Sequence, residues 1–311
     1  MSPSKESQAL AEHFKQLVPR FPADGDPFMQ RVLYEKVRDV GSEAPGVTIE
    51  DITIFANGLN VPCKWFKPEG TSSAKHVILF MHGGGFSFGS PDGHRKLTAH
   101  LAHTTHCPAI SPDYRLSPEH PYPAALDDCL TTYQHLLTLG YDPTKIILAG
   151  DSCGGGLSAS LPLAAIQRGL PVPGLSIALS PAYDWSTQTG GTMDSNKDHD
   201  LINTAPFVKL LSDRYVQGSG VNATEPLVSP LLASDEDLRR MPPTWISVAG
   251  HDMLRDHGER MAKRLRGLGV EVVLEVQEGQ QHVMEFMVGR APEATGSIGR
   301  IGEWARGKVG G

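Results

Sequence analysis

The sequence predicts an α/β fold built on a mostly parallel sheet that helices cover on both faces. Short apolar runs typical of buried strands alternate with longer stretches of helical periodicity, the order expected of strand–helix–strand units. Two strands without an intervening helix open the series. One later strand leads directly into a helix through a tight, glycine-flanked turn. These three observations fix the fold class.

The elements follow in chain order. Helices are expected at 7–18 and 27–40, with prolines between them. A strand at 47–56 should pair with one at 61–67 across Asn57-Gly58, a strong hairpin signal. The later strands are expected at 76–81, 109–111, 145–149, 175–180, 244–249 and 270–276. The later helices are expected at about 92–106, 122–138, 155–167, 205–216, 254–267 and 292–307, and Pro162 should bend or interrupt the third of these.

Residues 184–230 do not follow the alternation and contain one helix candidate, 205–216. They are either a plain surface excursion or, together with the N-terminal helices, a cap over the carboxyl ends of the strands, where open α/β sheets place their sites. We favour the cap. The expected division is N-terminal cap helices at 1–45, a cap insertion at 184–230, and a core made of 46–183 and 231–311.

Composition and charge argue against some kinds of binding partner and cellular location. The formal net charge is −7 without a Lys/Arg cluster, which argues against nucleic acid and anionic membranes. The polar N-terminus lacks the apolar core of a secretory signal, and no apolar run approaches the roughly 18 residues that span a bilayer. The four cysteines form no C-x-x-C pair. Free thiols in a reducing cytoplasm are the expectation.

The turn between strand 145–149 and helix 155–167 reads Gly150-Asp151-Ser152-Cys153-Gly154. A serine on such a strand–turn–helix junction is a nucleophile elbow, whose crowding requires small residues two positions before and after the serine. Gly85-Phe86-Ser87-Phe88-Gly89 matches the same G-x-S-x-G pattern, but turn-forming residues follow it instead of a helix. We therefore predict Ser152 as the nucleophile rather than Ser87.

A serine needs a base, and the base needs an orienting acid. Asp252 follows strand 244–249 and His282 follows strand 270–276, so both should lie at the same sheet edge as Ser152. Capping of the next helix would also explain Asp252. The rival acids, Asp256 and Glu259, fall inside a helix pattern, and the rival histidines, His251 and His257, precede the last strand. Asp252 and His282 are the predicted acid and base.

His82-Gly83-Gly84-Gly85 directly follows strand 76–81. Glycines let backbone N–H groups face a site without Cβ interference, and acyl transfer needs such donors for the developing oxyanion. We predict the N–H groups of Gly84, Gly85 and Cys153 as these donors. A flexible glycine loop is the plain alternative. A phosphate-binding loop would need G-K-[ST] or G-x-G-x-x-G, and neither is present here.

In combination these motifs resemble the hormone-sensitive-lipase-like family of α/β-hydrolases from about residue 76 onward. The residues that carry the likeness are His82-Gly83-Gly84-Gly85, the run Asp113 to His120, Gly150 to Gly155, Asp252 to Asp256, and His282. The resemblance implies an α/β-hydrolase fold with an eight-stranded sheet, a small helical cap, and a structural turn at Asp113 to His120. The chain departs from the family in having Cys153 where alanine is usual, and Val283 where glycine is frequent.

The expected activity is serine carboxylesterase on short-chain or compact small-molecule esters, without a metal or an organic cofactor. Amidase, lactonase and deacetylase use the same triad, and the sequence does not separate them. A non-catalytic receptor on this fold would typically lack the triad histidine, and a peptidase would need a further domain to sieve its substrates. The family likeness is also the sole basis for expecting a homodimer through the last strand and helix.

Overall fold

The computed structural model describes residues 3–17 and 26–309 of the 311. Eight strands form one sheet in the order β1-β2-β4-β3-β5-β6-β7-β8. β1 pairs antiparallel with β2, and β2 with β4, while every later pairing is parallel. The mostly parallel eight-stranded prediction is confirmed. The strands are β1 (Val47–Ala56), β2 (Leu59–Pro68), β3 (Val77–Met81), β4 (Ala109–Pro112), β5 (Ile146–Asp151), β6 (Leu175–Leu179), β7 (Thr244–Ala249) and β8 (Val272–Gln277).

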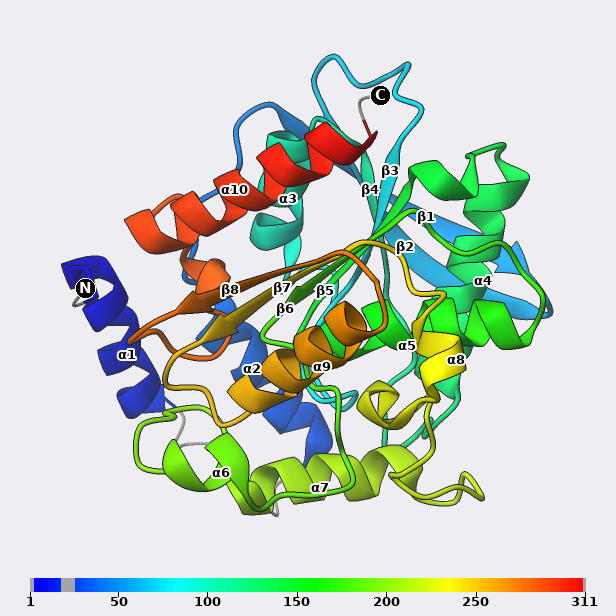
Figure 1. Ribbon diagram of the computed structural model, residues 1–311. Coiled ribbons are helices and arrows are strands. Elements are labelled where there is room, and N and C mark those ends of the chain that lie inside the picture. Colours follow the sequence, from blue (N-terminus) through cyan, green and yellow to red (C-terminus); the bar gives the residue numbers. More distant parts are fainter. Residues whose placement is uncertain (1–2, 18–25, 310–311) are drawn as a thin grey trace.

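Helices cover both faces of this sheet (Figure 1). They are α1 (Lys5–Leu17), α2 (Pro27–Arg38), α3 (Arg95–Thr105), α4 (Ala124–Thr138), α5 (Cys153–Gln167), α6 (Gly191–Ser195), α7 (Ala205–Val216), α8 (Asp235–Leu238), α9 (Arg255–Gly267) and α10 (Pro292–Val309). Short 3-10 turns lie at Pro143–Lys145, Pro230–Leu232 and Met284–Met287. Each predicted helix is present where the structure describes it, although residue 18 lies outside the described residues. Within the described part of the chain, each helix is too short or too polar to cross a membrane.

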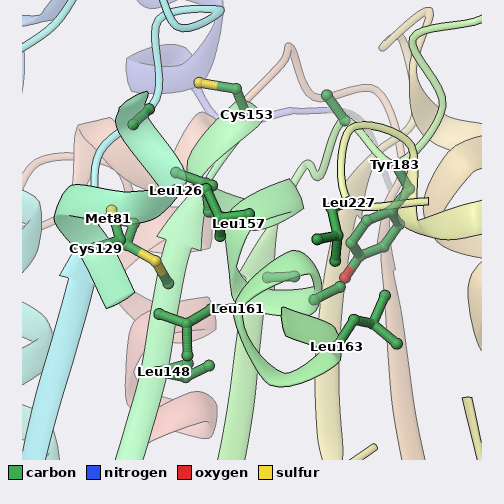
Figure 2. Close-up of a cluster of buried hydrophobic side chains, with 14 of the residues drawn as sticks. Met81, Leu126, Cys129, Leu148, Cys153, Leu157, Leu161, Leu163, Tyr183 and Leu227 are labelled. Atoms are coloured by element: carbon green, nitrogen blue, oxygen red, sulfur yellow. The ribbon is translucent and has the colours of Figure 1, made fainter. Parts of the chain in front are cut away.

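Alternation along the strands divides the core in two. On β3, Ile78 and Phe80 face the layer of α3 and α10, whereas Leu79 and Met81 face the layer of α4, α5 and α9. Figure 2 shows the second layer, where Leu157 and other side chains of α5 pack among side chains of β3, β5 and α4. Both faces of the central strands are therefore buried, which holds the carboxyl ends of β3, β5, β7 and β8 in fixed relative positions.

The predicted hairpin is confirmed. Asn57 and Gly58 both have positive φ, at 55° and 74°, and Ala56 pairs with Leu59 directly across the turn. Such a two-residue turn matches the right-handed twist of its strands. β2 therefore begins at Leu59, two residues earlier than the apolar pattern predicted.

Of the two effects predicted for Pro162, interruption of the helix is wrong, because α5 runs through it from Cys153 to Gln167, whereas bending stays a prediction. Proline has no N–H for the carbonyl of Ser158, four residues earlier. The hydroxyl of Ser176 on β6 donates to that carbonyl oxygen at 3.1 Å instead. A neighbouring strand thus supplies the hydrogen bond that the helix lacks.

Residues 184–230 contain a second short helix, α6, beside the predicted α7, which matches its predicted bounds. α6 spans only five residues, too few for a periodic pattern to be visible in the sequence. Figure 1 shows α2, α6 and α7 gathered at one end of the sheet. Leu211 of α7 lies against Gly85, and Tyr215 stacks on Phe86 with ring centroids 3.6 Å apart.

Candidate active site

The turn after β5 has the crowding that the sequence predicted. Ser152 has a φ of 54°, an uncommon conformation for a residue with a side chain, and α5 begins at the next residue. A Cβ on Gly150 would overlap the carbonyl oxygen of Gly154, and a Cβ on Gly154 would overlap that of Met81. The serine hydroxyl is thereby held at the start of α5, at the carboxyl end of β5.

Three side chains predicted from distant parts of the sequence lie in one line of hydrogen bonds. Nε2 of His282 is 3.0 Å from Oγ of Ser152, and Nδ1 of His282 is 2.6 Å from Oδ2 of Asp252. All three residues are buried. The arrangement is that of a nucleophile, a base and an acid that fixes the tautomer of the base.

Asp252 does not cap α9, the role that was its alternative explanation, because the N-cap of α9 is Leu254 and no side chain caps it. Its Oδ1 accepts the backbone N–H of Leu254 at 2.8 Å, while its Oδ2 faces His282. One oxygen therefore anchors the carboxylate to the turn before α9, and the other stays directed at the imidazole. The bond to Leu254 thus belongs to the turn before α9 and leaves Oδ2 free for His282.

The segment between α6 and α7 bonds to the loops that carry Asp252 and His282. Nδ2 of Asn196 donates to the carbonyls of Gly250 and Asp252 at 2.9 and 2.8 Å. Asp200 accepts the N–H of Met253 at 2.8 Å. On the other loop, Gln281 accepts the N–H of Leu201 at 3.0 Å and donates to the carbonyl of His199 at 3.0 Å. Residues 196–201 therefore tie both loops to one short segment.

Asp200 adds a second buried carboxyl beside the Asp252–His282 pair. Burial raises its pKa to about 6, and the nearby negative charge of Asp252 acts in the same direction. His282 and the backbone N–H groups of Met253 and Asn203 oppose the rise. The site thus holds two carboxyls whose environments differ.

The loop after β3 lies beside Ser152. Gly84 and Gly85 have φ of 114° and 59°, a backbone that favours glycine. The N–H of Gly83 donates to Oδ1 of Asp151 at 2.9 Å, which joins this loop to the turn that carries Ser152. The predicted oxyanion donors therefore come from two segments that are adjacent in space, the loop after β3 and the turn after β5.

Cys153 lies beneath this loop rather than facing solvent. Its sulfur accepts the N–H of Phe86 at 3.3 Å and lies 3.8 Å from the hydroxyl of Tyr114. Burial raises the pKa of the thiol to about 12, against the hydrogen bond from Phe86. The thiol is neutral at ordinary pH, so it is a packing group and a weak acceptor.

The rival residues have other partners. The hydroxyl of Ser87 lies 3.0 Å from that of Ser117, and Asp256 bonds Thr192 at 3.1 Å. Glu259 pairs with Arg255 at 2.9 Å. Among the histidines, the ring of His251 stacks on that of His199, Nδ1 of His257 accepts the N–H of Tyr183, and His82 stacks on Tyr114. Burial also lowers the pKa of His82 to about 3.

The turn from Asp113 to His120 is structural, as the resemblance implied. Tyr114 donates to the carbonyl of His82 at 2.6 Å, and Ser117 donates to that of Phe86 at 3.0 Å. Sequence reasoning missed Arg31, which bonds this turn to the loop after β3, and it missed Asn196 and Asp200. None of the three stands in a recognisable motif.

The chain is similar to known proteins in sequence and in fold. A family model described as α/β hydrolase fold matches residues 78–286. An esterase of Acinetobacter venetianus is 33% identical over 76% of this chain and 77% of its own length. A carboxylesterase of Mycobacterium tuberculosis is 32% identical over 81% of both chains. The crystal structure of an esterase from the bacterial hormone-sensitive lipase family superposes with a TM-score of 0.90 at 32% identity, covering 99% of this chain and 100% of that one.

Proposed function

Because the chain belongs to the hormone-sensitive-lipase-like family of α/β-hydrolases and is a carboxylic ester hydrolase, we propose that it acts through Ser152, His282 and Asp252. The observation that carries the proposal is the line of hydrogen bonds from Ser152 Oγ through both ring nitrogens of His282 to Asp252. No other serine of a G-x-S-x-G pattern has an imidazole partner among the described residues.

In the proposed reaction Ser152 Oγ attacks the ester carbonyl while Nε2 of His282 takes the hydroxyl proton. The N–H groups of Gly84, Gly85 and Cys153 stabilise the oxyanion. The C–O bond to the alcohol breaks, and His282 returns the proton to the leaving oxygen. Water then attacks the acyl-serine with His282 as base, which releases the acid and restores Ser152. Asp252 holds Nδ1 and stabilises the imidazolium throughout.

We propose that the substrates are short-chain or compact esters. The support is the aromatic crowding next to Gly85, where Phe86 stacks on Tyr215 and lies 5.5 Å from Trp185, measured between ring centroids. Such rings leave little room for a long chain on that side. The proposed cap consists of residues 1–45 and 184–230, of which residues 1–2 and 18–25 lie outside the described structure. Its helices α2 and α7 lie beside the loop after β3.

We also propose a cytoplasmic homodimer. The cytoplasmic placement is supported by the four cysteines, all free and buried. The dimer is supported by β8, which ends the order of the sheet and so offers one edge of its backbone to a second copy. Light scattering on the purified protein should give twice the chain mass of 33.6 kDa. A single-chain mass would contradict the dimer.

The test of the proposed reaction is a series of p-nitrophenyl esters from acetyl to palmitoyl, assayed with wild type, Ser152→Ala and Ser87→Ala. The rate should peak at short chains and fall on the order of 10⁴- to 10⁶-fold in Ser152→Ala. Ser87→Ala tests the other G-x-S-x-G sequence and should keep far more activity than Ser152→Ala, although it removes the bond between the hydroxyls of Ser87 and Ser117. Activity that survives in Ser152→Ala would refute the assignment, and a peak at palmitoyl would refute the proposed substrate class.

A further inference from the structure

The side chain of Arg31 joins α2 to two other segments. One is the oxyanion loop, which is residues 82–90, and the other is the turn that contains Ser117 and Glu119. Its Nε donates to the carbonyl of Ser87 at 2.9 Å, and Nη2 donates to the carbonyl of Ser117 at 3.1 Å. Nη1 and Nη2 donate to the two carboxylate oxygens of Glu119 at 3.0 and 2.7 Å. One guanidinium on α2 thus holds both the loop and the turn that supports the loop.

Other contacts also hold this loop. The N–H of Gly83 donates to Asp151, the N–H of Phe86 donates to the sulfur of Cys153, and the ring of Phe86 stacks on Tyr215. Gly84, Gly85 and Phe86 have positive φ in succession, a conformation that side-chain-bearing residues rarely adopt. The segment Phe86–Ser87 is bonded to Ser117, whose N–H and hydroxyl both donate to the Phe86 carbonyl, at 2.7 and 3.0 Å. Arg31 secures the next carbonyl along, that of Ser87. The anchor lies two residues from Gly85.

The rest of α2 also packs on this loop. Tyr34 stacks on Phe88 with centroids 5.6 Å apart, and Glu35 accepts the hydroxyl of Ser90 at 3.0 Å. At its first turn α2 leaves Phe28 and Met29 exposed, at 66% and 53%. A helix of 12 residues is marginal on its own, so its order depends on docking against the loop. The loop and the helix therefore stabilise each other.

The ion pair itself contributes little stability, since the Arg31 and Glu119 side chains are 25% and 50% exposed. Its effect on charge is visible in Glu119, where the hydrogen bond from Arg31 lowers the carboxyl pKa. What the guanidinium provides is geometry, because a planar fork can reach two carbonyls and a carboxylate at once. A lysine ammonium is a point donor and cannot match all three.

We propose that Arg31 is a positioning residue for the oxyanion hole, which makes catalysis depend on the docking of α2. The inference rests on the proposed function, in which the Gly84 and Gly85 amides stabilise the oxyanion. Loss of Arg31 lets the Phe86–Ser87 segment move and takes those amides out of line, while Ser152 and His282 keep their own contacts. A shift of about 1 Å at a positioning group can cost up to about 100-fold in rate.

The experiment compares Arg31→Ala, Arg31→Lys and Glu119→Gln with Lys209→Ala, which breaks an exposed ion pair on α7. On a short p-nitrophenyl ester, Arg31→Ala should lower kcat about 10- to 100-fold with KM little changed, because the amides act mainly in the transition state. Arg31→Lys should recover only part, and Lys209→Ala should match wild type. Guanidinium chloride at a sub-denaturing concentration should restore kcat of Arg31→Ala, whereas equal sodium chloride should not.

A wild-type kcat in Arg31→Ala, or a loss confined to KM, would overturn the proposal. A loss that guanidinium does not restore and that follows the unfolded fraction, measured by circular dichroism, would also overturn it. If Arg31→Ala does not fold, Arg31→Lys decides by the same kcat criterion. Glu119→Gln should lower kcat less than either, because the bonds of Arg31 to the carbonyls of Ser87 and Ser117 remain. Ser152→Ala, assayed in parallel, distinguishes failure of the proposed function from failure of this inference. Residual activity in Ser152→Ala refutes Ser152 as the nucleophile. An inactive Ser152→Ala beside a fully active Arg31→Ala refutes only the role of Arg31.

Discussion

Ser176→Ala should destabilise the protein without touching the candidate active site. Ser176 is fully buried on β6, and its hydroxyl donates to the Ser158 carbonyl that Pro162 leaves without a helical N–H. Removal of the hydroxyl leaves a buried acceptor unpaired, which costs about 1–3 kcal/mol. Urea denaturation should show that loss in the free energy of unfolding, with an unchanged m-value.

The proline makes this reasoning testable by a double-mutant cycle. In Pro162→Ala the new N–H can reach the Ser158 carbonyl, so Ser176→Ala should cost less in that background, with a coupling energy of about 1–2 kcal/mol. Ser158→Ala is the control for the second bond of Ser176, to the Ser158 hydroxyl at 3.1 Å, because it leaves the Ser158 carbonyl in place. It also removes the bond of that hydroxyl to the Gly155 carbonyl at 2.7 Å, so its cost is measured separately in both backgrounds. An equal cost of Ser176→Ala in both backgrounds would refute the role assigned to the hydroxyl.

Three further predictions concern the surroundings of Ser152. Gly154→Ala should prevent native folding or destabilise it by more than about 4 kcal/mol, because the Cβ would overlap the backbone of Met81; a soluble variant with wild-type melting would contradict this. Burial raises the pKa of Asp200 to about 6. Between about pH 4 and 6 the native state therefore binds more protons than the unfolded state. Because of this carboxyl, the free energy of unfolding falls as pH rises through that window. Asp200→Asn should therefore cost less relative to wild type in urea denaturation at pH 7 than at pH 4.5, and an equal cost would refute the shift. Cys153, with its thiol pKa raised to about 12, should not react with Ellman's reagent in the native protein and should react once unfolded; rapid native labelling with loss of activity would show a reactive thiol instead.

Local rules explain why the turn at Ser152 could be predicted from the sequence. The requirement for Gly150 and Gly154 arises from contacts within a few residues and from the end of β3, and strand–turn–helix order is visible in the pattern. Asp252 and His282 could be predicted because parallel strands bring their carboxyl ends to one edge, so the loops after β7 and β8 must converge. Motif positions and strand order were therefore enough to predict Ser152, Asp252 and His282.

The missed features depend on contacts between segments far apart in sequence. Arg31 reaches residues 56 to 88 positions away, and nothing near it in the chain signals those acceptors. Asn196 and Asp200 lie in a stretch without periodicity and gain their roles only by meeting the loops of Asp252 and His282. Pro162 does not interrupt α5, and the hydrogen bond that the proline cannot make to the Ser158 carbonyl comes from a neighbouring strand. Each of these needs the tertiary structure.

The most direct test of the central claim is to label the protein with diethyl p-nitrophenyl phosphate and locate the adduct by mass spectrometry. A phosphoryl group should attach once per chain, on Ser152, with loss of esterase activity in proportion to labelling. The reason is that the Ser152 hydroxyl is bonded to an imidazole that Asp252 orients, and it lies beside the proposed oxyanion donors. Ser152→Ala should remain unlabelled. An adduct on Ser87 or another residue, or full labelling that leaves turnover intact, would contradict the assignment of Ser152 as the nucleophile.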